Sequence, residues 1–195
     1  MGTYDLIYQK FQKEKGDTYP IRVSGSRETL AELFSDLGFK IGAEIGTRRG
    51  LFAKVLLRSN SGLKLYCIDP YSPYVECDDQ RKQDKIFIEA KRRLRKYDVE
   101  HVRKCSMDAL SDINDESLNF VYIDGLHDEM NVYNDISCWL KKVRSNGIIS
   151  GHDYFSSEEH PCVQVVLAVD RFFKGTDWLL HVTTDQYPSW FAVKQ

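Results

Sequence analysis

The sequence lacks the cysteine spacing of a redox or zinc site. Its five cysteines include no C-x-x-C pair, and an odd number cannot all pair with one another. We therefore expect reduced, mostly buried thiols. Long apolar runs are also missing: none approaches the roughly 20 residues that cross a bilayer, and residues 1–15 are polar. These absences predict a cytoplasmic protein with no membrane partner.

An excess of positive charge is missing as well. The formal charge of the 195 residues is −2, which argues against a general nucleic-acid binder. Residues 81–104 hold ten Lys or Arg against four Asp or Glu. However, Ile86, Ala90, Leu94 and Tyr97 recur in that stretch at helical spacing, so it is interpreted as a helix with a solvated basic face.

Repeats and linkers rich in Gly, Ser or Pro are absent, so nothing divides the chain into separate folding units. What is present is 42% hydrophobic and 29% charged residues, with Trp 3, Tyr 11 and Phe 10, a composition that excludes a disordered chain. Length and composition together predict one domain with one sizeable core.

Short apolar runs alternate with segments of helical periodicity. Ser26 is placed to cap the first of these helices, and Gly38 to end it. The last two runs are joined by only seven residues, 183–189, which is too short for a parallel crossover and predicts an antiparallel pair. The expected strands are residues 41–45, 64–68, 99–105, 118–123, 147–150, 178–182 and 190–193.

This alternation predicts an α/β fold: a doubly wound, mostly parallel, seven-stranded Rossmann-like sheet with a C-terminal antiparallel hairpin. We expect residues 41–195 to form this domain and residues 1–40 to form a lid or an oligomerisation segment. Such sheets bind ligands at the carboxyl ends of their strands, so the residues that follow each strand matter most.

Glycines and polar residues follow nearly every expected strand. Gly46 and Gly50 let the backbone turn sharply and let a ligand approach, although a tight turn alone would also explain them. Asp69 can accept hydrogen bonds from both hydroxyls of a ribose, or it can form a turn before Pro70. Because Asp69 stands 19 residues after Gly50, the two features together predict a nucleoside cofactor.

These motifs make the sequence similar to the class I S-adenosylmethionine-dependent methyltransferases. Within that class it resembles a small group, methyltransferase family 24-like, whose fourth strand reads D-G-x-H and whose fifth ends in H-D. The resemblance covers roughly residues 26–193. The motifs that carry it are E-I-G-T-x-x-G (44–50), C-I-D (67–69), F-V-Y-I-D-G-L-H (120–127), D-I-S-C-W (135–139) and G-I-I-S-G-H-D-Y (147–154).

The resemblance implies which residues bind the cofactor. Glu44 would shape the first loop and help to hold the methionine amino group, and Asp69 would bind the ribose. One departure is plain, because many family members have a glycine where this chain has Arg48. The implied cofactor-binding residues are Glu44, Gly46, Thr47, Gly50 and Asp69, with Ser106 and Met107 at the adenine edge.

A second group of residues indicates a divalent cation. Asp124 and Asp153 follow adjacent strands, and two converging carboxylates must be protonated or neutralised. Residues 120–130 and 147–157 contain no Lys or Arg, which favours a metal. By resemblance to the metal-dependent O-methyltransferases of this fold, Asp124, His152 and Asp153 would hold Mg²⁺, Mn²⁺ or Ca²⁺ beside a substrate hydroxyl, with Asp124 taking part in catalysis. His127 or His152 is alternatively the general base, or the histidines only make hydrogen bonds at the strand ends.

The predicted activity is therefore S-adenosylmethionine-dependent O-methylation of a small-molecule hydroxyl, on a sugar or a phenol, by a chain that can form a homodimer. Two rivals remain at this point: an NAD(P)-dependent oxidoreductase and a non-catalytic cofactor-binding protein. The first needs glycines at positions 48 and 51, where the chain has Arg48 and Leu51. Arg48 and Arg49 can clamp an anion or be solvated. A substrate pocket or ordinary packing explains Tyr71, Tyr74, Tyr154 and Phe155.

Overall fold

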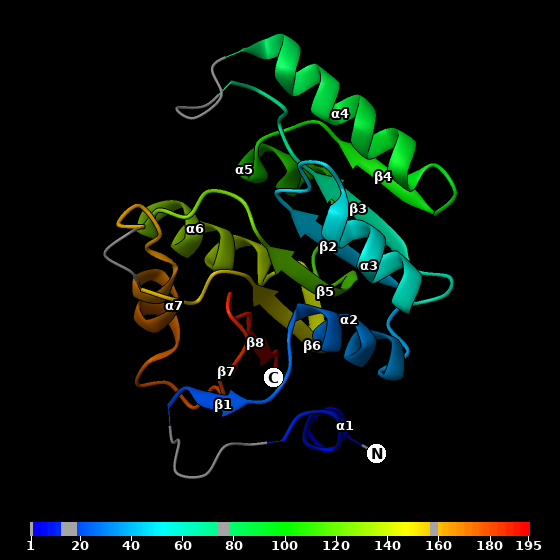
Figure 1. Cartoon of the computed structure of the whole chain (residues 1–195). Coiled ribbons are helices and arrows are strands. Elements are labelled where there is room, and N and C mark those ends of the chain that lie inside the picture. The colour runs from blue at the N-terminus through cyan, green and yellow to red at the C-terminus, as the bar shows by residue number, and fades with distance from the viewer. Residues whose placement is uncertain (1, 13–18, 74–78, 157–159) are drawn as a thin grey trace.

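The computed structural model describes residues 2–12, 19–73, 79–156 and 160–195. It contains one sheet of eight strands in the order β1-β7-β8-β6-β5-β2-β3-β4. β8 runs antiparallel to both of its neighbours, β6 and β7, whereas the other paired strands are parallel (Figure 1). The strands are β1 (Ile21–Val23), β2 (Ile41–Ile45), β3 (Lys64–Ile68), β4 (Val99–Val102), β5 (Leu118–Ile123), β6 (Val143–Gly151), β7 (His181–Thr183) and β8 (Trp190–Val193).

The fold class is confirmed, but the predicted number of seven strands is wrong. The eighth strand is β1, which pairs in parallel with β7 at the edge of the sheet. Three residues, Ile21-Arg22-Val23, are too few to show a periodic signal in the sequence. Two boundaries differ from the prediction: β4 ends at Val102 rather than at residue 105, and β6 begins at Val143 rather than at residue 147.

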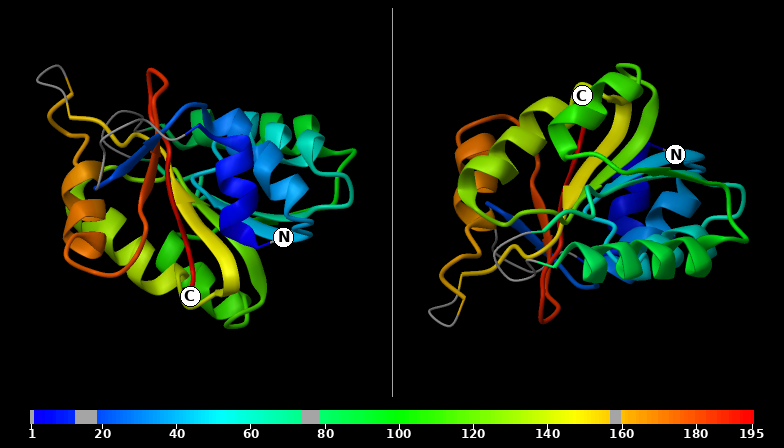
Figure 2. Two further views of the ribbon diagram at one scale, coloured as in Figure 1. Left: turned by 90° about the horizontal axis from the view of Figure 1, so that it is seen from below. Right: turned by 90° about the horizontal axis from the view of Figure 1, so that it is seen from above.

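Helices cover both faces of the sheet. The helices are α1 (Thr3–Lys10), α2 (Arg27–Asp36), α3 (Leu51–Ser59), α4 (Gln80–Leu94), α5 (Ser106–Ala109), α6 (Glu129–Trp139) and α7 (Val165–Phe173), with a 3₁₀ turn at Leu110–Asp112. Helices α1, α2 and α3 pack against one face, where α4 joins α3, and α5, α6 and α7 pack against the other (Figure 2). None of the described helices is long and apolar enough to cross a membrane.

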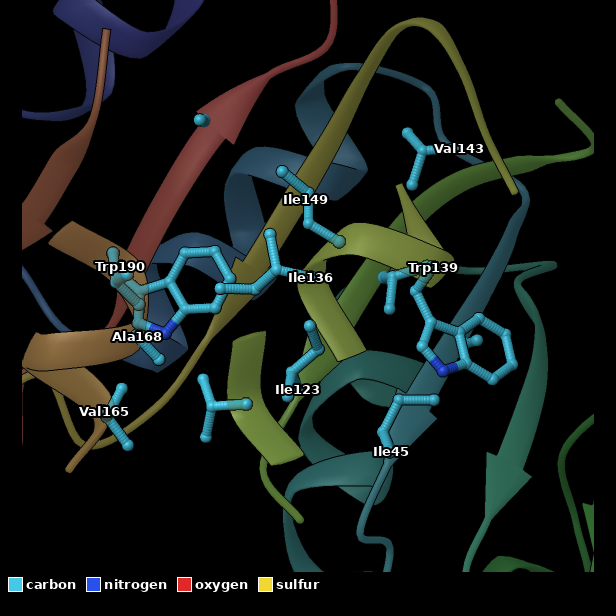
Figure 3. Packing of buried hydrophobic residues seen from close by; sticks show 14 of the residues in the cluster. Ile45, Ile123, Ile136, Trp139, Val143, Ile149, Val165, Ala168 and Trp190 are labelled. Atoms are coloured by element: carbon cyan, nitrogen blue, oxygen red, sulfur yellow. The ribbon is translucent and has the colours of Figure 1, made fainter. Parts of the chain in front are cut away.

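The core follows from the alternation of side chains along the central strands. In β5, Phe120 and Tyr122 face α2 and α3, while Val121 and Ile123 face α6. The second face is filled mainly by α6 and α7: Figure 3 shows Ile136 and Trp139 of α6 beside side chains of the sheet. A sheet buried on both faces accounts for the apolar character of β2 and β5 in the sequence.

Part of the N-terminal segment 1–40 belongs to the same core. Ile7 and Phe11 are fully buried, and the ring of Phe11 lies 5.3 Å from that of Phe191 in β8. α2 begins after Ser26, whose hydroxyl accepts a hydrogen bond from the Glu28 amide, as the sequence predicts for a cap. A further role of this segment as a lid or an oligomerisation element stays a prediction.

Candidate active site

The carboxyl ends of the parallel strands meet at one edge of the sheet, as the fold requires. Backbone hydrogen bonds hold neighbouring ends in register: the Asp124 amide donates to the Ile45 carbonyl at 2.8 Å, and the His152 amide donates to the Ile123 carbonyl at 3.0 Å. The Asp69 amide likewise donates to the Val102 carbonyl at 3.1 Å. The residues that follow β2, β3, β5 and β6 therefore start from fixed positions beside one another.

The loop after β2 depends on its glycines. Gly46 has φ +88°, and a Cβ there would lie 2.0 Å from the Asp124 carbonyl oxygen, so no other residue fits. Gly50 has φ +67° and precedes α3. Between them Arg48, at the position where glycine was expected, also adopts a left-handed conformation with φ +47°. Its amide donates to Asp69 at 2.8 Å, which holds the loop against β3.

Glu44 is a buried carboxyl at the end of β2. It is 2% exposed, and its Oε2 atom has no hydrogen-bond donor among the described residues. Burial raises the pKa of Glu44 well above its ordinary value, and the nearby carboxylates of Asp124 and Asp69 raise it further. A cationic ligand at this position would relieve both effects.

Asp69 has the turn-forming role considered for it, and its binding of a ribose stays a prediction. Its two oxygens accept hydrogen bonds from the amides of Arg48 and Tyr71, both at 2.8 Å, so it organises two loops. Burial raises the pKa of Asp69, although these two amides lower it in part. Each carboxylate oxygen has a second lone pair, so binding to ribose hydroxyls remains open to it.

Ser106 and Met107 begin α5, after β4. Met107 is 39% exposed, whereas the Ser106 hydroxyl points inward. It donates to a carboxylate oxygen of Asp135 and accepts from the Trp139 indole at 2.7 Å. Strand-end reasoning missed Asp135 because it lies on a helix. Its signal in the sequence was a carboxyl on the buried face of α6, beside Val132, Ile136 and Trp139.

Asp124, His152 and Asp153 converge as predicted. Each offers one ligand atom, and these atoms lie within 4.8 Å of one another. The Nδ1 atom of His152 is 3.0 Å from Asp153 and 3.8 Å from Asp124. His127 joins the group through Nε2, at 3.2 Å from Asp153 and 3.5 Å from Asp124. The described residues thus bring two carboxylates and two imidazoles into a single cluster.

The backbone at Asp153 is held in an unusual conformation. Its φ of +57° is left-handed, which costs free energy for a residue other than glycine. The next residue fixes it: the Tyr154 amide donates to the Pro188 carbonyl at 2.9 Å, and the Tyr154 hydroxyl donates to Asp170 of α7 at 2.6 Å. Tyr19 donates to the same Asp170 oxygen at 3.2 Å.

A positive charge reaches this cluster from the N-terminal segment, which the sequence argument did not foresee. Arg27 begins α2 and lies 5.3 Å above the ring of Phe52, which contacts Tyr122. Burial acts to raise the pKa of Asp153, but the hydrogen bond from His152 and the charges of His127 and Arg27 outweigh it and lower that pKa. The segments next to the carboxylates contain no Arg or Lys, as the sequence shows, but Arg27 contributes a positive charge from a distant part of the chain. β1 is parallel to β6 through β7 and β8, so Arg27 follows another carboxyl end at the same edge.

The remaining candidates are mostly structural. Tyr71 and Tyr154 are 1% and 6% exposed, so they pack rather than line a pocket. Arg49 forms an ion pair with Glu89, and the exposed Arg48 contributes its backbone. Phe155 contacts the rings of His160 and Tyr187, while Tyr74 lies outside the described residues.

Comparison with known families identifies the class of protein. The family model described as "Methyltransferase domain" matches residues 43–154, which include the glycine loop, Asp69, Ser106 and the Asp124–Asp153 cluster. The chain belongs to this family. The predicted class I S-adenosylmethionine-dependent methyltransferase is confirmed, and the oxidoreductase alternative is set aside. No curated protein matches the sequence.

Solved structures agree on the fold. An O-methyltransferase from Bacillus cereus, in complex with S-adenosylhomocysteine, has a TM-score of 0.61 at 18% identity, covering 98% of this chain and 90% of that one. TomG from Streptomyces achromogenes, an O-methyltransferase of tomaymycin synthesis in complex with S-adenosylmethionine, has a TM-score of 0.61 at 16% identity, covering 87% and 78%. An rRNA methylase from Streptococcus thermophilus has a TM-score of 0.62 at 14% identity, covering 87% and 97%.

Proposed function

We propose that the chain transfers the methyl group of S-adenosylmethionine to a hydroxyl oxygen of a small molecule, such as a phenol or a sugar, with the help of a divalent cation. The convergence of Asp124, His152 and Asp153 beside the glycine loop is the observation that carries this proposal. Two of the structures with this fold are named O-methyltransferases. A homodimer, a cytoplasmic location and the absence of a nucleic-acid partner stay predictions.

The residues of the glycine loop fit the cofactor. The buried Glu44 oxygen that lacks a donor suits the methionine ammonium, and Asp69 suits the ribose hydroxyls. The cofactor would supply a methyl group bonded to a sulfonium sulfur, and S-adenosylhomocysteine would be the leaving group. The task left to the chain is to hold the acceptor oxygen in line with that methyl group and to remove the proton from the hydroxyl.

The cluster after β5 and β6 fits a cation. Two carboxylates and an imidazole nitrogen are ligands that Mg²⁺ or Mn²⁺ accepts, and a bound cation lowers the pKa of a substrate hydroxyl. His127, on the same two carboxylates, is placed to take up the released proton. The histidines and Arg27 also compensate part of the negative charge of the carboxylates. The alternative is therefore catalysis by His127 or His152 without a cation, and experiment must distinguish it from catalysis with one.

Calorimetric titration of Mn²⁺ into the protein saturated with S-adenosylhomocysteine tests the cation site. We expect wild-type protein to bind Mn²⁺, and Asp153→Asn to lower that affinity by about 10-fold or more while S-adenosylhomocysteine still binds. Asp108→Asn is the control, because the Asp108 side chain is exposed on α5 and makes no hydrogen bond to a described side chain. It should bind Mn²⁺ as the wild type does.

Transfer of a labelled methyl group to a panel of phenols and sugars tests the reaction itself. EDTA should stop the transfer, and excess Mn²⁺ should restore it. Full transfer in EDTA would contradict the cation and leave His127 or His152 as the unaided base. Transfer to none of the panel, with RNA accepted instead, would contradict the small-molecule acceptor.

A further inference from the structure

A basic pocket lies between α3 and the C-terminal end of α4, two helices that pack against each other (Figure 1). It is a cavity of about 410 Å³, and it shares no residue with the proposed methyl-transfer site. One lining residue belongs to α3, and the others belong to the end of α4 and the residues that follow it: Lys54, Arg92, Arg93, Arg95, Lys96 and Tyr97. Every lining residue except Tyr97 is a cation, and none is an acid.

Most of these cations have no anionic partner. Arg93 donates a hydrogen bond to the Arg49 carbonyl, which uses part of its donor capacity. The cations that form no ion pair and no side-chain hydrogen bond with a described residue are Lys54, Arg92, Arg95 and Lys96. Their donors are therefore available to a ligand in the pocket.

The acidic residues of α4 are engaged away from the pocket. Asp84 forms an ion pair with Arg103, and Glu89 forms one with Arg49. These are the acids of the helix, whose sequence is Q-R-K-Q-D-K-I-F-I-E-A-K-R-R-L. The positive charge at the end of α4 is thus not compensated by its own helix.

The helix dipole explains only part of this arrangement. Cations in the last turn stabilise a helix because they oppose its dipole, which is equivalent to about half an elementary charge. That effect accounts for a cation such as Arg92 on α4, but Lys54 lies on another helix and faces the same cavity. Like charges around one cavity repel each other, and a bound anion removes this repulsion.

The lining residues match the chemistry of phosphate. Arginine presents a planar fork of donors to phosphate oxygens, and lysine adds a point charge. A single phosphate group carries about −1.5 to −2 charges, so the cations of the pocket outnumber the charges of one such group. The volume lies at the lower end of the range of roughly 300 to 1,000 Å³ that is usual for small-molecule pockets.

We propose that this pocket binds a small molecule that carries two or more linked phosphate groups. Lys54 and Arg92 approach the phosphates from the two helices, and the hydroxyl of Tyr97 provides a further donor. The site goes beyond the proposed methyl transfer and does not depend on it.

Calorimetric titration of inorganic triphosphate into the whole chain tests this site. The buffer contains EDTA, and S-adenosylhomocysteine is added to occupy the methyl-transfer site. We expect wild-type protein to bind triphosphate about 10-fold or more tightly than orthophosphate, because more charges are paired. The affinity should fall as the NaCl concentration rises, because salt screens these charges. Failure of wild-type protein to bind triphosphate would overturn the proposal.

The double variant Lys54→Gln, Arg92→Gln should weaken triphosphate binding by about 10-fold or more, because a charged donor is lost from each wall. Arg81→Gln, Lys82→Gln is the matched control: it removes two exposed positive charges from the first turn of the same helix, outside the pocket. It should weaken binding by less than about 2-fold, since these charges are solvated and screened. An equal loss in both variants would show general attraction to a basic helix and would overturn the pocket.

A short single-stranded RNA serves as the competing probe. RNA that binds more tightly than triphosphate, and that loses affinity in both double variants, would show that α4 binds an extended polyanion along its length. That outcome would also overturn the small-molecule proposal. RNA that binds more weakly than triphosphate, with a loss confined to the pocket variant, would support it.

Discussion

Carboxyl groups on the two halves of the strand edge have opposite electrostatic surroundings. On the half formed by β2, β3 and β4, the pKa values of Glu44, Asp69 and Asp135 are all raised, because each carboxyl is buried and none forms an ion pair among the described residues. On the half formed by β5 and β6, histidines and Arg27 lower the pKa of Asp153. In the first half burial outweighs the charges of Arg48 and Arg103, which lower the pKa of Asp69 only in part, whereas in the second half the histidines and Arg27 outweigh burial at Asp153.

This difference matches the two partners of the proposed reaction. S-Adenosylmethionine carries an ammonium, which our proposal places against the buried carboxyl of Glu44. A neutral hydroxyl acceptor brings no charge, and the second half is compensated by histidines, Arg27 and, in our proposal, a cation. In our proposal, the cofactor's ammonium compensates Glu44 in the first half, while a neutral acceptor enters a half whose negative charge the protein compensates in part.

The largest expected effect is on how stability depends on pH through Asp135. Its folded pKa of about 6 lies above the ordinary 3.8, so the folded protein retains the proton longer than the unfolded chain, and stability falls as pH rises between these values. The difference corresponds to a penalty of about 3 kcal/mol above pH 6. Asp135→Asn should remove this penalty, and urea unfolding at pH 4.5 and 7.5 measures it. The same pH dependence in variant and wild type would show that Asp135 is not the group responsible.

The second largest effect is expected from removing the carboxylate of Asp69. Asp69→Ala loses hydrogen bonds to a charged group, and we expect it to weaken S-adenosylhomocysteine binding by about 1.5 to 3 kcal/mol, as measured by calorimetry. The loop that carries Arg48 should also loosen, since its amide loses its acceptor. Asp79→Ala, which removes the cap of α4 outside the site, is the control and should leave ligand affinity intact. Unchanged affinity in Asp69→Ala would leave Asp69 as a turn residue only.

Loss of the Tyr154 hydroxyl should affect the other half of the site. Tyr154→Phe removes one of the two donors to Asp170, and we expect a loss of about 1 kcal/mol in urea unfolding. Mn²⁺ affinity should fall with it, because Asp153 relies on Tyr154 for its left-handed backbone. Affinity for S-adenosylhomocysteine should not change. A loss of cofactor affinity instead would mean that the two halves are not independent.

The smallest effect is expected from Arg27. Arg27→Ala should change stability by less than about 1 kcal/mol, since the side chain is partly exposed and screened. The pKa of Asp153 should rise, because one of the charges that lower it is removed. NMR titration of the Asp153 carboxyl carbon would show this shift, and Lys in place of Ala should restore it in part. An unchanged pKa of Asp153 in Arg27→Ala would show that Arg27 does not compensate this carboxylate.

Much of this edge could be predicted from the sequence. Glycines and acids at the ends of apolar runs sufficed to place Gly46, Asp69, Asp124 and Asp153 together, because parallel strands end at one edge by geometry. The convergence of His152 with the two carboxylates was likewise predicted, since it directly follows a strand.

Features that depend on distant pairing could not be predicted in this way. β1 is three residues long and pairs only with a strand near the other end of the chain, so no local pattern reveals it, and Arg27 was missed along with it. Asp135 could have been predicted as a candidate, because an acidic residue on the buried face of an amphipathic helix is unusual and indicates a specific role. The partner that it finds, Ser106, depends on how α5 and α6 pack.

The pairing of Ile21 with His181 has a consequence for the order in which the molecule is assembled. Ile21 has its partner 160 residues further along the chain, so β1 cannot pair until β7 has been synthesised. Until β8 is in place, Phe11 has no Phe191 ring to pack against. At this edge of the sheet, closure therefore depends on a contact between segments far apart in the sequence.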